Sequence, residues 1–315
     1  MSKCLFCYGE LDSGDFHLSC SKKFFGNEIA PIVPYKLDEL YKLGKIIIEK
    51  RTAIPGVQSK LSVEIDKTIK SEPKIVIVGL WGNYILKPPS PHYNFLPEIE
   101  DVTMKLARLF GINTVQHSLI KFKSGQTAYL TKRIDREKNN KLHMEDFCQL
   151  SERLTEDKYK GSMESVVKLI DKYSSNPGLD KLTIFQITLF SFLTGNADMH
   201  LKNFSMIYKN DLIMLAPAYD LVSTRLVISE KDDPDESALS INGKRRKLKL
   251  SDFLSFAKSS GLEDKQIENS VKLFIKKIDR VINLIDQSFL SDGLKLSYKN
   301  LIIERGVRLE FIFDG

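Results

Sequence analysis

The sequence predicts an α+β protein in which a small β-rich lobe precedes a larger helical lobe. Two patterns lead to this prediction. Short apolar runs with partial alternation fill residues 45–136 around a single amphipathic helical pattern, and after residue 145 apolar residues recur at helical spacing. An antiparallel sheet with one helix between its strands is typical of an α+β lobe. We therefore divide the chain into an N-terminal segment (1–44), a β-rich lobe (45–136) and a helical lobe (137–315).

The composition is that of an ordinary folded protein. Of the 315 residues, 42% are hydrophobic and 28% are charged, which argues against a disordered or fibrous chain. The net charge of +6 suits phosphate-bearing ligands but falls short of a dedicated nucleic-acid binder. No apolar run is long enough to span a membrane, and the N-terminus lacks the pattern of a secretory signal. We therefore expect a cytoplasmic protein with no membrane or direct nucleic-acid partner.

The β-rich lobe contains six strand patterns and one helix pattern. We expect strands at 46–48, 61–65, 74–80, 84–87, 115–122 and 127–132. The helix is expected over 98–110, where apolar residues recur every three or four positions. It should end at Gly111, because glycine is a common residue just beyond a helix C-terminus.

Three helical patterns define the second lobe. Residues 162–173 and a long stretch beginning near Glu263 are amphipathic, whereas 182–193 is apolar on most faces and is expected to be buried. Two apolar runs, 204–208 and 212–215, flank a polar turn and are expected to pair as a hairpin.

Two charged segments of this lobe are expected at the surface. Residues 229–236 are dense in charge and are expected to form a mobile loop. The basic run at 244–249 could bind phosphates, but such a run more often forms a solvated hairpin.

The densest polar segment, Asn196–Asn203, follows the buried helix directly. A phosphoryl-transfer site needs a carboxylate that orients the attacking hydroxyl and accepts its proton, together with oxygen ligands for Mg²⁺. Protein kinases supply these groups as an Asp and an Asn with four residues between them, followed by a second Asp. Asp198 and Asn203 have this spacing, and Asp220 follows an apolar strand. Oxygen ligands of this kind suit a hard cation such as Mg²⁺.

Each of these residues also has a structural interpretation. An Asp and an Asn at this spacing are common, Asn196 and Asp198 can cap and turn the loop, and Asp220 can be an N-cap for the segment that follows it. His200 and Lys202 bring cations into the same loop as candidate catalytic residues. A lone histidine is more often structural, so His200 is expected to hold the loop. Taken singly, none of these residues establishes a catalytic site.

Candidate nucleotide-binding residues lie in the β-rich lobe. A turn before the second strand carries a glycine, which lets backbone N–H groups approach phosphate oxygens; its candidate residues are Gly56, Val57, Gln58, Ser59 and Lys60. Lys87 ends a strand and could pair the phosphates, with Glu100 of the helix fixing it. A solvated lysine at a strand end is the alternative.

A hinge between the two lobes is expected at 132–136, after the last strand of the β-rich lobe. Its backbone could hold adenine, and Asp135 could hold a ribose hydroxyl.

The N-terminal segment contains three of the four cysteines. Cys4 and Cys7 are followed by His17 and Cys20, and both pairs have two residues between them. This pattern supplies four ligands at the spacing of a tetrahedral Cys₃His zinc site, which would fold a segment too short to fold alone. A redox pair or buried thiols are the alternatives. We expect a structural zinc site on an appendage outside the core, not a nucleic-acid-binding finger.

Together these segments resemble the HipA-type serine/threonine kinases, the toxins of bacterial toxin–antitoxin pairs. The resemblance covers about residues 50–290 and rests on five motifs in the family's order, which lie at 55–62, 85–87, 132–136, 196–203 and 216–220. It implies a two-lobed protein-kinase-like fold. It further implies that Asp198 is the catalytic base, that Asn203 and Asp220 hold Mg²⁺, that Lys87 binds ATP phosphates, and that Lys132 and Ile134 offer backbone groups to adenine.

Two departures from the family pattern bear on regulation. Family toxins carry an autophosphorylated serine just before the glycine of the turn, whereas this chain has Ala53-Ile54-Pro55-Gly56. The family's longer members also have an additional N-terminal subdomain, for which the room before residue 50 is too short. The chain resembles the short members, in which a separate small protein supplies that subdomain.

These features predict an ATP- and Mg²⁺-dependent kinase that phosphorylates a hydroxyl group on a protein. The resemblance points to an aminoacyl-tRNA synthetase as the target. It also points to a HipB-like helix-turn-helix antitoxin or a small N-subdomain-like protein as the partner. Two alternatives stay open, namely a small-molecule kinase on the same scaffold and a catalytically silent module that binds a DNA-binding antitoxin.

Overall fold

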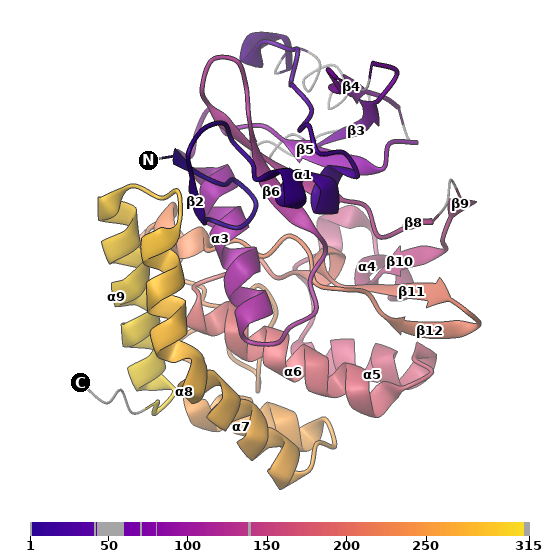
Figure 1. Cartoon of the computed structure of the whole chain (residues 1–315). Coiled ribbons are helices and arrows are strands. Elements are labelled where there is room, and N and C mark those ends of the chain that lie inside the picture. The colour runs from indigo at the N-terminus through magenta and orange to yellow at the C-terminus, as the bar shows by residue number, and fades with distance from the viewer. Residues whose placement is uncertain are drawn as a thin grey trace. The chain divides into compact units, whose positions relative to one another are not determined.

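The computed structural model describes residues 2–40, 42, 60–69, 71–79, 81–137 and 140–311. The chain divides into two units (Figure 1). The sheet unit comprises Met1–Asp101 and Val115–Arg133, and the helical unit comprises Val102–Thr114 and Ile134–Gly315. Helix α3 (Leu96–Leu109) begins in the first unit and ends in the second. Helices and sheets are segregated in the chain as the predicted α+β class requires.

The sheet unit is built on five antiparallel strands. They are β3 (Leu61–Asp66), β4 (Lys74–Ile77), β5 (Tyr84–Lys87), β6 (His117–Lys121) and β7 (Thr127–Lys132), in the order β4-β3-β5-β7-β6. Alternate residues of β3 are buried, as the alternating pattern predicts. The predicted strands at these five positions are confirmed, and the sixth, at 46–48, lies outside the described residues.

An extended connector joins the two edges of this sheet. Ile32 pairs with Lys74 of β4, and the adjacent Val33 pairs with Phe122, just beyond β6. The edges of a flat five-stranded sheet would lie about 19 Å apart, at about 4.8 Å for each strand spacing. Here each edge lies one strand spacing from one of two adjacent residues, whose Cα atoms are about 3.8 Å apart, so the edges are within about 13 Å of each other. The sheet is therefore curled.

The N-terminal segment packs into the core of the sheet unit. Strands β1 (Ser2–Lys3) and β2 (Glu10–Leu11) pair with each other, and helix α1 (Leu18–Phe25) follows them. Phe24 and Phe25 are buried in the hydrophobic core, and the Phe24 ring lies 5.9 Å from that of Tyr84 on β5. The expectation of an appendage outside the core is therefore wrong. An apolar pair on a short helix leaves water only by packing against another element.

Helix α3 has the predicted character and the predicted end. Ile99, Val102 and Leu106 are fully buried, so the apolar spacing of the sequence marks the packed face. Gly111 follows with φ +92°, and the N–H of Ile112 donates to the carbonyl oxygen of Ala107. This left-handed residue closes the helix as expected, because glycine adopts positive φ without steric cost.

The helical unit surrounds one apolar helix. Its helices are α4 (Phe147–Leu150), α5 (Met163–Tyr173), α6 (Pro177–Leu193), α7 (Leu250–Ser259), α8 (Asp264–Gln287) and α9 (Asp292–Arg308). Most of α6 is buried, as its apolar pattern predicts. The Phe110 ring packs against Phe190 of α6 and stacks at 4.3 Å on Phe274 of α8. The amphipathic patterns at 162–173 and after Glu263 are also confirmed as helices, whereas sequence analysis did not identify α4, α7 and α9.

Two small sheets complete the helical unit. Strands β8 (Arg136–Glu137) and β9 (Asn140–Lys141) form one, and β10 (Met144–Asp146), β11 (Ser205–Lys209) and β12 (Leu212–Leu215) form the other. The predicted hairpin is the β11–β12 pair. Among the described residues, no helix combines the length and apolar character that crossing a membrane requires.

A buried ion-pair network ties helix α9 to the segment before α7. Arg308 donates from Nη1 and Nη2 to the two carboxylate oxygens of Glu236, at 2.6 and 2.9 Å. Arg305, which is 1% exposed, approaches the same carboxylate at 3.2 Å. Both guanidinium groups lie over the Phe192 ring. Bidentate pairs of this kind combine strength with fixed geometry.

The charged segment at 229–236 is held in place by this network and by Arg225. Arg225 donates to the carbonyl oxygens of Asp233 and Asp235, at 2.6 and 2.8 Å. The expectation of a mobile surface loop is therefore wrong for its second half, because hydrogen bonds from Arg225 and Arg308 fix it. Charge density in sequence does not distinguish a solvated loop from a buried network.

The basic run at 244–249 is partly committed to neighbours in the helical unit. Lys244 pairs with Asp252 at 2.7 Å, and Arg246 pairs with Asp235 at 2.5 Å. Leu248 within the run is fully buried. These contacts give the run a structural role.

Glu236 is expected to make stability depend on pH. Burial alone would raise the pKa of this carboxyl group, but hydrogen bonds from Arg308 and the backbone of Leu248 outweigh it, and the pKa lies below its ordinary value of 4.5. Stabilisation by Glu236 is then complete above the carboxyl pKa of the unfolded chain and is lost as the pH falls through the lower folded-state pKa. We expect Glu236→Gln to lower the free energy of unfolding at pH 7 by about 3 kcal/mol and to weaken its acid dependence, measured by urea titration from neutral to acid pH.

Glu268→Gln is the matched control for this prediction. Glu268 pairs with Lys272 one turn away on α8, where both side chains are mostly exposed. An exposed pair contributes little, so this variant should follow the wild type. Equal acid dependence in the wild type and Glu236→Gln would contradict the assignment.

Candidate functional site

A buried ion pair lies between strand β5 and helix α3 in the sheet unit. Lys87, the last residue of β5, donates from Nζ to Oε1 of Glu100 at 2.5 Å, and both side chains are almost fully buried. The pairing predicted for these residues is thus present. Nζ also lies 5.3 Å from the centre of the Tyr129 ring on β7. The pair holds the Lys87 ammonium group in a fixed position, because removal of either partner would leave a buried charge uncompensated.

A second buried acid, Asp101, follows Glu100 on α3. Its Oδ1 accepts a hydrogen bond from His117 Nδ1 at 2.8 Å, and its Oδ2 accepts one from the Tyr8 hydroxyl at 2.5 Å. Burial and the charge of Asp101 raise the pKa of Tyr8 well above its ordinary value, so the hydroxyl stays protonated and donates. The His117 ring stacks on that of Tyr129, with centroids 5.5 Å apart. Sequence reasoning missed Asp101, His117 and Tyr8, since they meet only in the folded unit.

The remaining predicted nucleotide-binding residues of the sheet unit are placed as follows. Gly56, Val57, Gln58 and Ser59 lie outside the described residues, and Lys60 is exposed directly before β3. Lys132 donates from its backbone N–H to the Gln116 carbonyl oxygen and from Nζ to the Gln116 side chain, both at 2.8 Å. The N–H of Lys132 is therefore engaged within the sheet.

Two hinge candidates fall in the helical unit. Ile134 is its first residue after the sheet unit and is half-buried. The Asp135 carboxylate accepts a hydrogen bond from Arg136 Nη1 at 2.6 Å, and both side chains are mostly buried. This contact fixes the orientation of the Asp135 side chain.

The turn that follows helix α6 admits only glycine. Gly195 has φ +68°, and a Cβ atom there would lie 2.7 Å from Leu301 and 2.8 Å from Arg225. Both the backbone angle and the close approach exclude a larger residue. The tight turn delivers Asn196 and the polar loop directly from the end of the buried helix.

Hydrogen bonds within the loop position Asp198 and Asn203. Asn196 Oδ1 accepts the backbone N–H of Asp198 at 3.1 Å, so it caps the turn as one sequence interpretation held. Asn203 is buried, and its Nδ2 donates to the Asp198 carbonyl oxygen at 2.8 Å. This bond fixes the orientation of the Asn203 amide group, so that its oxygen Oδ1 is directed away from the Asp198 carbonyl. The spacing of four residues thus closes a compact loop.

Asp220 has an unusual backbone conformation. Its φ is +59°, a left-handed value that most residues avoid but Asp tolerates better than most. The neighbouring Tyr219 hydroxyl hydrogen-bonds Ser205 at 2.5 Å and donates to the Lys202 carbonyl oxygen at 3.1 Å, which anchors this segment to the polar loop. Strained backbone of this kind clusters at functional sites. The oxygens of Asn203 and Asp220 are of the type that Mg²⁺ prefers, so the residues present fit that ion.

His200 and Lys202 have structural contacts. His200 is buried, and its ring packs edge-on against Tyr159 at 5.1 Å. Burial lowers its pKa, although the charges of Asp198 and Asp220 favour its protonated form. Lys202 donates from Nζ to Asp146 at 2.6 Å. His200 is thus placed to hold the loop, and Lys202 ties it to strand β10.

Tyr159 is a site residue that sequence reasoning missed. Its hydroxyl donates to Oδ1 of Asp198 at 2.7 Å. Burial and the charge of Asp198 raise the pKa of Tyr159, so this hydroxyl remains a donor. No local signal reveals it, because 39 residues separate the two in sequence.

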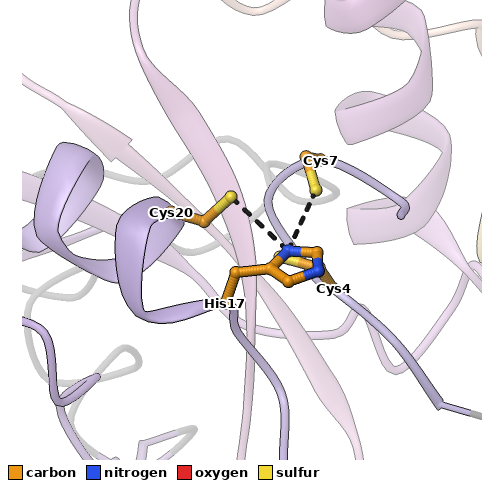
Figure 2. A group of neighbouring side chains, drawn as sticks. All are labelled: Cys4, Cys7, His17 and Cys20. Atoms are coloured by element: carbon orange, nitrogen blue, oxygen red, sulfur yellow. Dashed lines mark hydrogen bonds between the residues drawn. The ribbon is translucent and has the colours of Figure 1, made fainter. Parts of the chain in front are cut away.

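The four predicted zinc ligands meet in the sheet unit (Figure 2). The ligand atoms of Cys4, Cys7, His17 and Cys20 all lie within 4.8 Å of one another. All four cysteines of the chain are free thiols, and Cys148 belongs to helix α4 of the helical unit. The sequence pattern therefore identified a real spatial cluster.

Comparisons with known proteins identify the family of this chain. Residues 52–282 match the family of HipA-like C-terminal domains. A Haemophilus influenzae protein named "Putative kinase" is 30% identical over 82% of this chain and 82% of its own length. "Putative kinase Y4mE" of Sinorhizobium fredii is 29% identical over 74% of this chain and 57% of its own length. The serine/threonine-protein kinase toxin HipA of Shewanella oneidensis is 28% identical over 55% of this chain and 43% of its own length.

Two solved structures share the fold. HipA of Shewanella oneidensis, in complex with HipB and operator DNA, matches with a TM-score of 0.68 and 22% identity over 88% of this chain and 71% of that chain. The Helicobacter pylori proinflammatory kinase CtkA matches with a TM-score of 0.56 and 17% identity over 78% of this chain and 93% of that chain. The predicted kinase-like α+β fold is therefore confirmed, while the roles predicted for individual site residues stay predictions.

The left-handed backbone at Asp220 predicts that glycine is more stable than alanine at this position, which is the reverse of their order within a helix. Alanine at φ +59° should be strained by about 1–2 kcal/mol, whereas glycine is not. We therefore expect Asp220→Ala to be less stable than Asp220→Gly in urea unfolding.

Asp171, within helix α5, gives the matched comparison. There Asp171→Gly should be less stable than Asp171→Ala by about 1 kcal/mol. If alanine were the more stable residue at both positions, Asp220 would not be strained in solution.

Proposed function

Because the chain belongs to the family of HipA-like C-terminal domains, we propose that it is an ATP- and Mg²⁺-dependent serine/threonine protein kinase. The observation that carries the proposal is the buried Lys87–Glu100 pair. Active protein kinases require a lysine of the sheet paired with a glutamate of the helix in the same lobe, since this pair holds the ammonium group at the nucleotide phosphates. Here strand β5 and helix α3 supply the two partners.

Asp198 has the surroundings of a base that orients a hydroxyl. Its Oδ1 already accepts the Tyr159 hydroxyl at 2.7 Å, which is hydrogen-bond reach for a general base. We infer that Tyr159 stands in for the substrate hydroxyl and leaves Asp198 when a substrate binds. Asp198 then accepts the proton of that hydroxyl as the hydroxyl oxygen bonds to the terminal phosphorus of ATP, and the bond from that phosphorus to the bridging oxygen breaks to release ADP.

Asn203 and Asp220 are the residues that would hold Mg²⁺. Mg²⁺ bound there would neutralise charge that develops on the phosphate oxygens. The chain contributes positioning, through the Asn203 bond to the Asp198 carbonyl oxygen and the Tyr219 bond to Lys202. Lys202 and His200 act in this proposal by holding the loop, through Asp146 and Tyr159 respectively.

The substrate and partner are proposed from the relatives. HipA of Shewanella oneidensis is a serine/threonine-protein kinase toxin, and its structure contains HipB and operator DNA. We propose a hydroxyl on a protein as the acceptor, with an aminoacyl-tRNA synthetase as the target that the resemblance implies. A HipB-like helix-turn-helix protein or a small protein that supplies an N-terminal subdomain is the proposed partner.

Substitution of Lys87 should affect ATP binding and folding stability in ways that a second substitution, at Glu100, can distinguish. Lys87→Met leaves the Glu100 charge buried without its partner, so the free energy of unfolding should fall by about 3–5 kcal/mol. The double variant Lys87→Met/Glu100→Leu removes that charge and should recover most of the stability, but not ATP binding. Stability is measured by urea unfolding and ATP binding by calorimetry. ATP affinity equal to wild type in the double variant would contradict the role of Lys87.

Asp198→Asn should abolish phosphoryl transfer while leaving the fold intact. The amide cannot accept the proton, so we expect a loss of about 10²- to 10⁴-fold in rate. The assay incubates the protein with Mg²⁺, labelled ATP and a cell lysate. Asp171→Asn, an exposed carboxylate paired with Lys181, is the control and should transfer label at the wild-type rate.

The same assay distinguishes the other functions. Label on a metabolite but on no polypeptide would establish a small-molecule kinase. No transfer by the wild type to any acceptor would favour a catalytically silent binding module.

A further inference from the structure

The cysteine cluster has the dimensions of a metal site. A tetrahedral zinc ion with Zn–S of about 2.3 Å and Zn–N of about 2.0–2.1 Å places a sulfur and a nitrogen ligand about 3.6 Å apart. His17 Nδ1 lies 3.4 Å from Cys7 Sγ and 3.7 Å from Cys20 Sγ (Figure 2). These two distances match those around one tetrahedral ion, and all four ligand atoms lie within 4.8 Å of one another.

The histidine of the cluster is oriented for metal binding. His17 Nε2 lies 2.9 Å from the Glu10 carbonyl oxygen, which can only accept a hydrogen bond. The ring proton is therefore on Nε2, and the lone pair of Nδ1 points at the thiols. A backbone carbonyl that fixes the far nitrogen of a ligating histidine is a recurrent feature of metal sites.

The backbone closes tightly around the cluster. Cys4 donates its N–H to the Gly9 carbonyl oxygen, and Tyr8 donates its N–H to the Cys4 carbonyl oxygen. A Cβ atom at Gly9 would lie 3.3 Å from the His17 ring and 3.4 Å from Cys7 Sγ. The turn leaves room for glycine where the ligands converge.

The same turn reaches the buried acid of helix α3. Tyr8 lies between Cys7 and Gly9, has φ +68° and is 3% exposed. Its hydroxyl meets Asp101, the residue directly after Glu100. Asp101 also accepts from His117, so the first turns of α3 are fixed from two sides.

We propose that Cys4, Cys7, His17 and Cys20 bind a zinc ion that holds the Tyr8 turn against Asp101, so that the metal site positions the helix carrying Glu100. In this arrangement zinc affects the position of helix α3, which carries none of its four ligands. Tyr8 and Asp101 are positioning residues in this arrangement. The proposal concerns metal binding and helix position, and it does not depend on kinase activity.

A strained turn explains why an ion is needed there. Tyr8 adopts a left-handed conformation, which costs a bulky residue about 1–2 kcal/mol. The segment before α1 contains only the two-residue strands β1 and β2, which provide little stability of their own. Metal ligation contributes folding free energy directly to such a segment. It can therefore stabilise a conformation that the chain alone would not keep.

The first experiment measures metal content of the full-length chain. We expect one zinc ion per chain in the wild type and in Cys148→Ser, by elemental analysis, and a loss of at least tenfold in Cys20→Ser. Cobalt added to the metal-free wild type should give the intense visible bands of a tetrahedral thiolate site. Absence of both zinc and cobalt binding in the wild type would overturn the proposal.

The second experiment measures amide hydrogen exchange over the first turns of α3. Tyr8→Phe keeps every ligand but removes the hydroxyl bonded to Asp101, so it should retain zinc while exchange at 96–101 accelerates by about tenfold or more. Cys20→Ser should show the same acceleration, and Cys148→Ser should not. Peptides from helix α5 report on global unfolding and should be unchanged in all variants. Wild-type exchange at 96–101 in Tyr8→Phe would overturn the positioning role, whatever the zinc content.

Discussion

The ion pair between Lys87 and Glu100 is the constraint on which the sheet unit is organised. Two opposite charges withdrawn from water are tolerated only when their geometry is fixed, because a shift of either partner leaves a buried charge uncompensated. Strand β5 holds the lysine through pairing on both sides, with β3 and β7. Helix α3 holds the glutamate, and Asp101 anchors that helix through Tyr8 and His117. The position of one ammonium group thus depends on elements from the beginning to the end of the sheet unit.

The N-terminal segment is part of this organisation. Phe24 and Phe25 enter the sheet core, and Tyr8 reaches helix α3. The connector at Ile32 and Val33 links both edges of the curled sheet. A segment that contains few hydrogen-bonded elements of its own therefore fixes both the curvature of the sheet and the helix that carries Glu100. Binding of the proposed zinc ion by four residues contributes folding free energy to this segment and so keeps it ordered.

The helical unit positions its polar loop by different means. Gly195 ends the buried helix α6 with a turn that no other residue fits, and Asn196 and Asn203 close the loop around Asp198. Asp220 is presented by a left-handed backbone that Tyr219 anchors to the loop. These contacts are local to the unit. They fix the backbone and the side-chain amide of this loop, and polar groups held in place in this way suit a site where charge develops in a reaction.

From the sequence we predicted the fold class, the five strands of the main sheet, the four helices α3, α5, α6 and α8, the pairing of Lys87 with Glu100 and the grouping of the four zinc-ligand candidates. Each of these depends on short-range periodicity, or on an order of motifs that only a few folds share. Tertiary packing places the N-terminal segment in the core, pairs Glu236 with two arginines of helix α9, and brings Tyr8 and Tyr159 to Asp101 and Asp198. These contacts join residues 39 to 93 positions apart, and the partner of a polar side chain is set by which elements pack together. Such long-range contacts leave no periodic pattern in the sequence.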